Sequence, residues 1–356
     1  MNVLILGYFG GKNSGDSATL AGNIIAIDSA TGQKNNYKVI STMRGTVSDI
    51  DCYIDRQIDF IWFDDLPRDI DLVVIANGGV PGAFVLNHVI SALDNNIPVI
   101  ATCIKAPIFP NTRLAAVWKA IMPDFKLCLT RLKRNEQLIR ALGISNVNLA
   151  CDFAAFNQSD SNFFPGYYLN DDRRFGAEQY AICFPRVTYH HYECSNQFQI
   201  LWYTEFIKQN PALPILFASL GENDFEICSH FRFFKNVVIL DLKHYQFREL
   251  LWLVQNCKAA ISSGRFHGMI YALMTRRPCA LITDRPGFVM DSVPTFGSDP
   301  SRFVALANDF NIPIIDRFSG LDRILDESKK IQYADFTALT VHTMALLKSS
   351  FSGALK

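Results

Sequence analysis

Short apolar runs alternate with stretches of helical periodicity along most of the chain. Residues 2–6 form an apolar run that ends at Gly7, and the apolar residues of segment 17–28 recur at helical spacing. The first half continues with strands expected at 37–40, 72–76, 98–102 and 126–130, and helices at 84–93, 113–121 and 135–142. Strands separated by helices predict a doubly wound, parallel α/β sheet.

The alternation stops between residues 157 and 177, where Ser, Asp, Asn, Pro and Gly replace the apolar periodicity. It then restarts, with strands expected at 181–184, 214–219, 237–240, 259–262 and 279–282, and helices at 197–209, 247–255 and 265–274. We therefore expect two Rossmann-like domains facing a cleft, with function in the strand-to-helix loops. The expected division is 1–156 for the first domain, 157–177 for a linker, 178–328 for the second domain and 329–356 for a C-terminal helical segment that packs back across a domain.

Composition and charge narrow the class of protein. The chain is 49% hydrophobic and 19% charged, and this composition excludes a disordered chain. Its 356 residues are too many for one ordinary hydrophobic core. Lys and Arg (34) balance Asp and Glu (34), so electrostatics does not direct the chain to nucleic acid or an anionic membrane. No apolar run is long enough for a membrane helix or a signal peptide, and we expect a cytoplasmic protein without an integral membrane segment.

Cysteine and histidine spacing argues against a metal site. The nine cysteines include no CxxC pair and lie singly in apolar stretches, as buried thiols do in a reducing compartment. The seven histidines show no ligand spacing with Cys, Asp or Glu. We expect no metal and no cofactor.

A glycine-rich loop, GYFGGKNSGD, joins the first strand to its helix. Its glycines, Gly15 among them, let backbone approach a ligand closely, while Asn13 and Asp16 bring polar groups. Asp16 is suited to cap the helix, and it is also suited to meet sugar hydroxyls or act as a base. The two roles are compatible.

A second loop, SSGRFHG, lies between the strand at 259–262 and its helix. The helix start offers unpaired amides, and Arg265 adds a guanidinium that can grip a phosphate or carboxylate. His267 can change charge near neutral pH, and although a lone histidine is more often structural, an arginine, a histidine and two glycines in one loop favour a functional role. Both side chains reach the cleft only if Arg265 lies on the lip of the helix. The candidate donor-binding residues of this loop are Ser263, Gly264, Arg265 and Gly268.

Other strand ends carry weaker candidates. Gly78 and Gly79 permit close approach of a ligand or close packing, and Glu222 follows the strand at 214–219. Arg186 follows the strand at 181–184, either as a second anion clamp or as a surface arginine. Asp152 is expected to cap a turn.

Taken together, the NSGD loop, the early GG, Arg131 after a strand, Asp152 in CDFAAF and the SGRFHG loop resemble the polysaccharide pyruvyl transferase family. The resemblance implies a GT-B-like fold, phosphoenolpyruvate as donor and a pair of glycan hydroxyls as acceptor. The product would be a pyruvate ketal of a surface polysaccharide or another glycan. The first domain would then hold the acceptor and the second the donor.

The resemblance also assigns roles. The family's Arg-x-His element falls on Arg265 and His267, and its second-domain arginine falls on Arg186, so these residues would bind phosphoenolpyruvate. His267 as imidazolium would protonate the methylene carbon, while Asp16 or another carboxylate of the first domain takes a hydroxyl proton. The acceptor is either free or lipid-linked, and a lipid-linked acceptor would place the enzyme at the inner membrane face.

Two other functions fit the same expected fold. One is a nucleotide-sugar glycosyltransferase with Arg265 on the diphosphate and Glu222 on the ribose. The other is a glycan-binding protein without catalytic activity.

Overall fold

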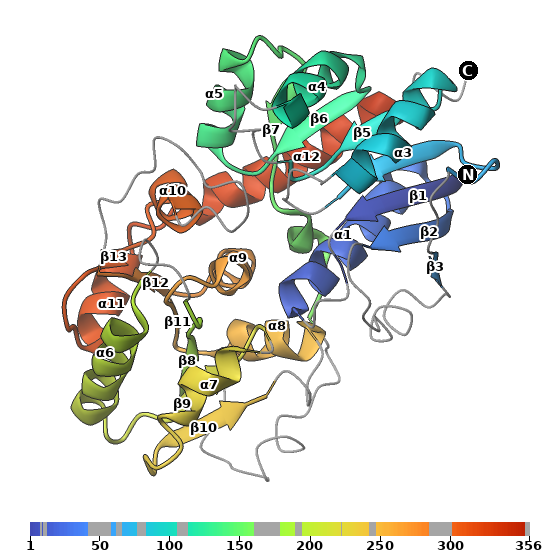
Figure 1. Cartoon of the computed structure of the whole chain (residues 1–356). Helices are drawn as coiled ribbons and strands as arrows, with labels where there is room; N and C mark the ends of the chain where they lie inside the picture. The colour runs from blue at the N-terminus through green and yellow to red at the C-terminus, as the bar shows by residue number, and fades with distance from the viewer. Residues whose placement is uncertain are drawn as a thin grey trace.

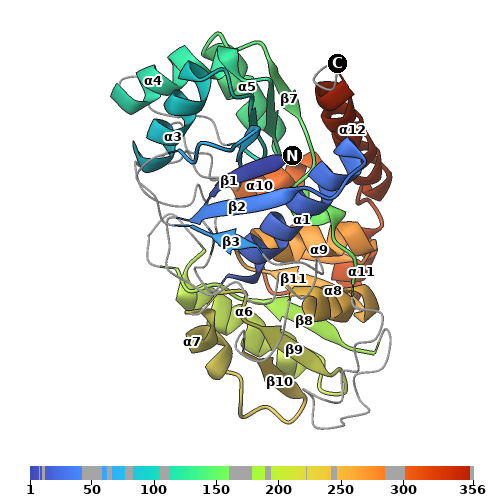
Figure 2. The ribbon, with the colours of Figure 1, turned by 90° about the vertical axis from the view of Figure 1, so that its right-hand side faces the viewer.

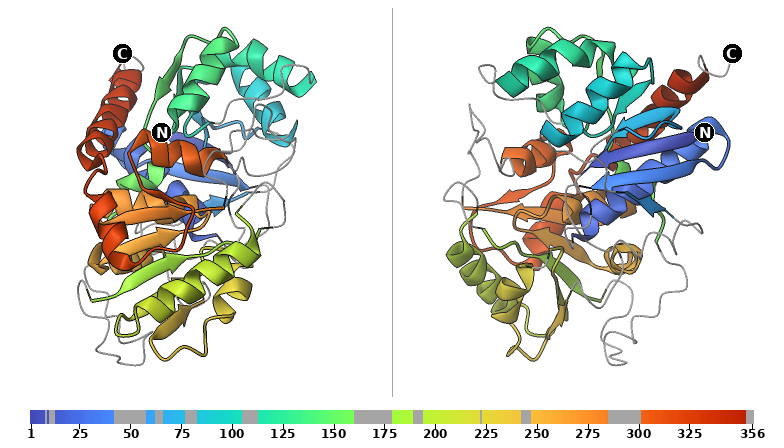
Figure 3. Two further views of the ribbon diagram at one scale, coloured as in Figure 1. Left: turned by 90° about the vertical axis from the view of Figure 1, so that its left-hand side faces the viewer. Right: turned by 45° about the vertical axis from the view of Figure 1, so that its right-hand side comes forward.

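In the computed structural model the chain forms two parallel β-sheets in separate halves of the molecule, each packed against helices (Figures 1 and 3). The structure describes residues 1–7, 9, 13–41, 58–61, 66–76, 83–104, 113–159, 179–188, 194–221, 223–241, 247–284 and 301–352. Of the predicted site residues, Gly78, Gly79 and Glu222 lie outside these ranges.

The first sheet has the strand order β3-β2-β1-β4-β5-β6-β7. The order of its elements along the chain is β1 (Asn2–Gly7), α1 (Ser14–Thr31), β2 (Asn36–Ser41), β3 (Asp59–Phe60), β4 (Leu72–Ile75), α3 (Ala83–Asp94), β5 (Val99–Ala101), α4 (Arg113–Ile121), η1 (Met122–Asp124), β6 (Leu127–Thr130), α5 (Lys133–Ala141), β7 (Val147–Leu149) and η2 (Phe153–Phe156). The central strands read as continuous apolar runs because helices cover both faces of the sheet.

The second sheet has the order β10-β9-β8-β11-β12-β13. Its elements, and the helices that follow them, are β8 (Ala181–Phe184), α6 (Asn196–Gln209), β9 (Ile215–Ala218), α7 (Asp224–Ser229), β10 (Val237–Leu240), α8 (Phe247–Asn256), β11 (Ala259–Ser262), α9 (Phe266–Thr275), β12 (Cys279–Ile282), α10 (Ser301–Asp309), β13 (Ile314–Ile315), α11 (Leu321–Ser328) and α12 (Tyr333–Ser352). Among the described residues, the paired strands of both sheets run parallel, as the alternation of strands and helices predicts.

Both sheets reverse their strand order at an internal point. The reversal falls between β1 and β4 in the first sheet and between β8 and β11 in the second. Ligands of open α/β sheets bind beside the carboxyl ends of the strands at such a point. The loops that follow β1, β8 and β11 therefore start at these positions. These three loops carry most of the predicted site residues.

The last helix returns to the first half of the molecule. Figure 2 shows α12 beside α1, and α12 packs against both α1 and α9. The hydroxyl of Thr343 accepts a 2.9 Å hydrogen bond from the Cys151 backbone N–H, and Leu347 and Phe351 are buried. The C-terminal segment thus contacts helices of both halves of the molecule.

The segment predicted as a linker begins inside the first core. Asn157 is buried, and its Nδ2 donates to the carbonyls of Ala18 (2.7 Å) and Ala154 (2.8 Å). Its position as the first linker residue is therefore wrong, because these hydrogen bonds fix it to α1 and η2. Residues 160–178 lie outside the described ranges.

Within the residues that the structure describes, none of the helices combines the length and apolarity that crossing a membrane requires.

Candidate active site

The start of α1 is set by Asn13. The Asn13 side chain accepts a hydrogen bond from the Gly15 N–H (3.0 Å), so Asn13 is the N-cap and the helix begins at Ser14. Asp16 lies in the first helical turn and is 8% exposed. The predicted capping role of Asp16 is therefore wrong, because the chain enters the helix three residues earlier. An acidic side chain in the first turn is stabilised by the helix dipole.

The start of α9 is built by a tight turn after β11. Gly264 has a φ of +110°, which favours glycine. The Arg265 N–H donates to the Ser262 hydroxyl (3.0 Å), which in turn donates to the Arg265 carbonyl (2.9 Å). Arg265 is the N-cap and His267 lies in the first turn of α9. Arg265 thus occupies the lip of the helix, which is the condition for both side chains to reach the same place.

The starts of α1 and α9 meet, although α1 follows a strand of the first sheet and α9 follows a strand of the second. Asn13 and Gly221 form an antiparallel bridge, and the Ser14 N–H donates to the Leu220 carbonyl (3.2 Å). A Cβ atom added to Gly15 would lie 2.0 Å from His267 Nδ1. Only glycine at position 15 therefore lets α1 lie against the imidazole ring.

His267 is enclosed by groups from the first half of the molecule. Its Nε2 lies 3.2 Å from the Thr19 hydroxyl oxygen and 3.7 Å from Asp152 Oδ2. Burial lowers the pKa of His267 to about 4, the Asp152 carboxylate opposes this shift, and the Arg131 guanidinium adds to it. The imidazole is neutral at neutral pH in the free protein.

Arg131 and Asp152 form a buried ion pair beside this histidine. Their side chains are 4% and 0% exposed, and the Arg131 guanidinium also lies 4.3 Å from the ring centre of Phe266. Asp152 caps η2 by accepting from the Ala154 N–H (2.9 Å), as predicted for a turn. Burial acts to raise the pKa of Asp152, but Arg131 and His267 outweigh it and the net pKa is lowered. Asp152 therefore stays ionised.

Arg265 forms a second ion pair, with Asp224. The Arg265 side chain is 18% exposed and donates through Nη2 to Asp224 Oδ1, while its Nε is buried without a hydrogen-bond partner. Asp224 is fully buried and also accepts from the backbone N–H groups of Gly221 (3.0 Å) and Val187 (3.3 Å). A Cβ on Gly221 would lie 2.6 Å from Arg265 Nη2, so the guanidinium crosses directly over this glycine.

Gln199 of α6 ties together the loops after β8 and β11. Its side chain accepts from the Arg186 N–H (3.0 Å) and donates to the Arg186 carbonyl (2.8 Å). The Ser263 hydroxyl donates to the same Gln199 side chain, so this predicted donor-binding hydroxyl instead holds the loop. The half-buried Arg186 guanidinium lies 5.6 Å from the Phe303 ring centre.

Gly268, another predicted donor-binding residue, is a packing position. A Cβ there would lie 2.5 Å from the Phe184 ring of β8. The glycine therefore allows the first turn of α9 to pack closely on the sheet, and it has no side chain to offer a ligand.

The structure thus brings Asn13, Gly15 and Asp16 to the same place as Arg265 and His267. Three further residues lie where these two helices start and were missed by sequence reasoning: Thr19, Asp224 and Tyr271. The Tyr271 hydroxyl donates to the Ser14 carbonyl at 3.5 Å. Asp224 follows the β9 strand end closely, which is a detectable signal. Thr19 and Tyr271 lie one turn inside their helices, where position in the sequence gives no signal.

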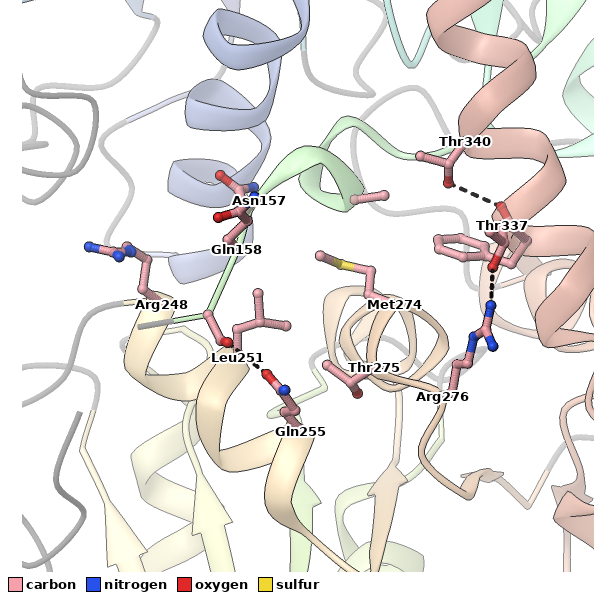
Figure 4. Close-up of a pocket in the computed structure, with 13 residues that line it drawn as sticks. Asn157, Gln158, Arg248, Leu251, Gln255, Met274, Thr275, Arg276, Thr337 and Thr340 are labelled. Carbon is pink, nitrogen blue, oxygen red and sulfur yellow. Dashed lines mark hydrogen bonds between the residues drawn. The ribbon is translucent and has the colours of Figure 1, made fainter. Parts of the chain in front are cut away.

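A cavity of about 690 Å³ lies elsewhere, between α8, α9 and α12 (Figure 4). Arg248, Gln255, Met274, Arg276 and Thr337 are among the residues that line it, whereas none of the predicted site residues does. It is therefore separate from the place where α1 and α9 start. Among the described residues, no cluster of His, Cys, Asp and Glu is arranged to hold a metal ion.

Two Rossmann-like units with facing strand-end loops define the GT-B fold, and solved structures share it. UDP-GlcNAc 2-epimerase from Neisseria meningitidis, bound to UDP-GlcNAc, superposes with a TM-score of 0.62 at 10% identity over 100% of both chains. The 2-epimerase of Rickettsia bellii gives 0.56 at 12% identity over 98% of this chain and 96% of that one. The glycotransferase of kitacinnamycin gives 0.52 at 12% identity over 99% and 97%. These likenesses concern the fold alone.

The sequence identifies the family within this fold class. The model of the polysaccharide pyruvyl transferase family matches residues 19–285, so the chain belongs to that family and is a transferase. The matched range contains Arg131, Asp152, Arg186, Arg265 and His267, and it begins after the Asn13 cap. No curated protein sequence matches the chain.

Proposed function

We propose that this transferase moves the enolpyruvyl group of phosphoenolpyruvate onto two hydroxyls of a glycan, which closes a pyruvate ketal and releases phosphate. The observation that carries the proposal is the contact between the two helix starts. It sets His267 against the first turn of α1 and beside Arg265 on the lip of α9.

The donor side is the start of α9. Phosphoenolpyruvate carries a phosphate and a carboxylate, and two arginines with a helix N-terminus suit both groups. Arg265 has a buried Nε without a partner, and Arg186 lies nearby, its Cδ 3.6 Å from the position of a Cβ on Gly264. These residues would bind the donor so that its double bond faces His267.

The reaction balances with two proton transfers. One hydroxyl oxygen attacks C2 as C3 takes up a proton, and the resulting adduct still carries phosphate. The second hydroxyl oxygen then displaces phosphate from C2 and closes the ketal. Of the two hydroxyl protons, one ends on the new methyl carbon and the other on the released phosphate.

His267 is the residue that we assign to protonate C3. The neutral imidazole of the free protein gains a proton when the anionic donor binds, because a nearby negative charge raises the pKa of a histidine. Asp16, buried in the adjacent turn of α1, would take the hydroxyl proton. General acid–base transfer of this kind contributes about 10²–10⁴ in rate.

The acceptor would be a saccharide, either free in the cytoplasm or carried on a lipid at the inner membrane face. The family supports a saccharide acceptor, and the start of α1 in the first half of the molecule offers Asn13 and Asp16 to its hydroxyls.

Phosphate release tests donor and acceptor together. The protein is incubated with phosphoenolpyruvate and a panel of glycans, and we expect phosphate and an acid-labile ketal only when both are present. His267→Asn should abolish turnover while donor affinity, measured as the rise in Tm, changes little. A rise in Tm with a UDP-sugar and none with phosphoenolpyruvate would instead identify a glycosyltransferase.

A further inference from the structure

Thr19 contacts His267 from the adjacent helix and is fully buried. Its hydroxyl donates to the Gly15 carbonyl one turn earlier, at 2.8 Å, and its oxygen lies 3.2 Å from His267 Nε2. A threonine hydroxyl has one proton to donate. Because that proton is used within α1, the contact with the histidine requires the hydrogen on Nε2 and the lone pair on Thr19.

We propose that Thr19 fixes the neutral His267 in the tautomer with hydrogen on Nε2, so that Nδ1 is the nitrogen that exchanges protons with the substrate. The first part concerns the free protein, whereas the second rests on the proposed pyruvyl transfer. Thr19 is thus a positioning residue that acts through His267.

Asp152 supports the same tautomer from another direction. Its Oδ2 lies 3.7 Å from Nε2, and a carboxylate favours a hydrogen on the nearer ring nitrogen. Arg131, which pairs with the same oxygen, leaves Asp152 ionised and without a proton to give to the ring. Both groups that face Nε2 therefore accept a hydrogen bond.

Gly15 leaves the Nδ1 lone pair open within the ring plane. A Cβ on Gly15 would lie 2.0 Å from Nδ1 and only 2.4 and 2.7 Å from the neighbouring Cγ and Cε1. An atom along the in-plane lone pair would be much farther from both neighbours than from Nδ1. The α1 backbone thus covers the face of the ring and not the direction in which Nδ1 accepts a proton.

The charged groups around the imidazole come from four parts of the chain. They are Asp152 before η2, Arg131 after β6, Arg302 of α10 and Arg265 at the α9 cap. Burial opposes protonation most strongly, the three arginines add to it, and only Asp152 favours it, so the ring stays neutral and its tautomer matters. The neutral form has to keep its hydrogen on the side away from the substrate.

The tautomer can be read directly from NMR of protein labelled with ¹⁵N-histidine at neutral pH. We expect the hydrogen of His267 on Nε2 in the unsubstituted chain and in Thr19→Ser, which keeps the hydroxyl. In Thr19→Val, which is nearly isosteric, we expect a fraction of the Nδ1–H form to appear beside the Nε2–H form, because only the more distant Asp152 still faces Nε2. A hydrogen on Nδ1 in the unsubstituted chain, or an unchanged Nε2–H signal in Thr19→Val, would overturn the proposal.

Kinetics then tests the role of Nδ1. Thr19→Val should lower kcat by about tenfold or more without a matching change in the donor KM, and Thr19→Ser should restore it. An unchanged kcat in a Thr19→Val protein with the altered tautomer would overturn the assignment of Nδ1. The spectrum needs no substrate, so absence of turnover with phosphoenolpyruvate would contradict the proposed function and leave the tautomer standing.

Discussion

Two arginine–aspartate pairs lie near His267, and they differ in how far water reaches them. Arg131 is 4% exposed, is sealed beneath the Phe266 ring and pairs with a fully buried Asp152. Arg265 is 18% exposed, has a buried Nε without a partner and pairs with an equally buried Asp224. The two pairs therefore differ in what they can do, because only the Arg265 guanidinium is partly exposed and keeps a donor, Nε, that no protein group uses.

The difference decides which arginine can bind an anion. Arg131 could meet a ligand only by leaving a carboxylate uncompensated in the interior, which is strongly unfavourable. Arg265 has a donor, Nε, that no protein group uses. Asp224 also accepts hydrogen bonds from two backbone N–H groups. We infer that the first pair holds the structure and the local charge, while the second pair is the one open to a donor.

Breaking the buried pair should have the largest effect. Arg131→Met leaves Asp152 charged and buried, so we expect the free energy of unfolding to fall by about 3–5 kcal/mol. Urea denaturation measures it. Adding Asp152→Asn, which keeps the η2 cap, should recover much of the loss. A smaller loss in Arg131→Met than in Arg265→Met would contradict the comparison.

The pH dependence of stability should be the next largest effect. In the unfolded chain His267 gains its proton near pH 6.5, but in the folded protein only near pH 4. Protons therefore favour the unfolded state as pH falls from 6.5 to 4, and this group costs about 3 kcal/mol of stability across that window. Urea titrations at each pH should show the loss, and His267→Gln should remove this part of it. Parallel pH profiles for the two proteins would contradict the lowered pKa.

Removing the open arginine should change binding more than stability. Arg265→Met loses charge-assisted hydrogen bonds to the donor, each worth about 1.5–3 kcal/mol, so phosphoenolpyruvate should bind about 10–100-fold more weakly. Calorimetric titration measures the affinity, and His267→Asn serves as the matched control because it leaves both ion pairs in place. Unchanged donor affinity in Arg265→Met would assign the anion site elsewhere.

The sequence predicts the place of this site better than its internal contacts. Arg265 and His267 are predictable because a strand, a glycine turn and a helix follow one another within a few residues. Strands such as β4 and β11 are also predictable, because they are continuous apolar runs. The two-residue strands β3 and β13 are not, because they are too short to show a period.

The ion pairs were not predictable, because they join residues far apart in the sequence. Asp224 lies 41 positions from Arg265 and meets it only because β9 and β11 end at the same edge of one sheet. The neutral state of His267 likewise depends on burial by α1, a helix of the other sheet. Spacing in one chain carries no measure of such desolvation.

A third arginine–carboxylate pair extends the comparison to the exposed surface and should have the smallest effect. Arg140 and Glu136 on α5 are 46% and 24% exposed and lie one helical turn apart. Water and salt screen such pairs, which are worth about 0.3–0.5 kcal/mol. Glu136→Gln should therefore lower the free energy of unfolding by no more than this, and the difference should shrink in high salt while the loss in Arg131→Met persists. A loss in Glu136→Gln that matches Arg265→Met would show that exposure does not rank the three pairs.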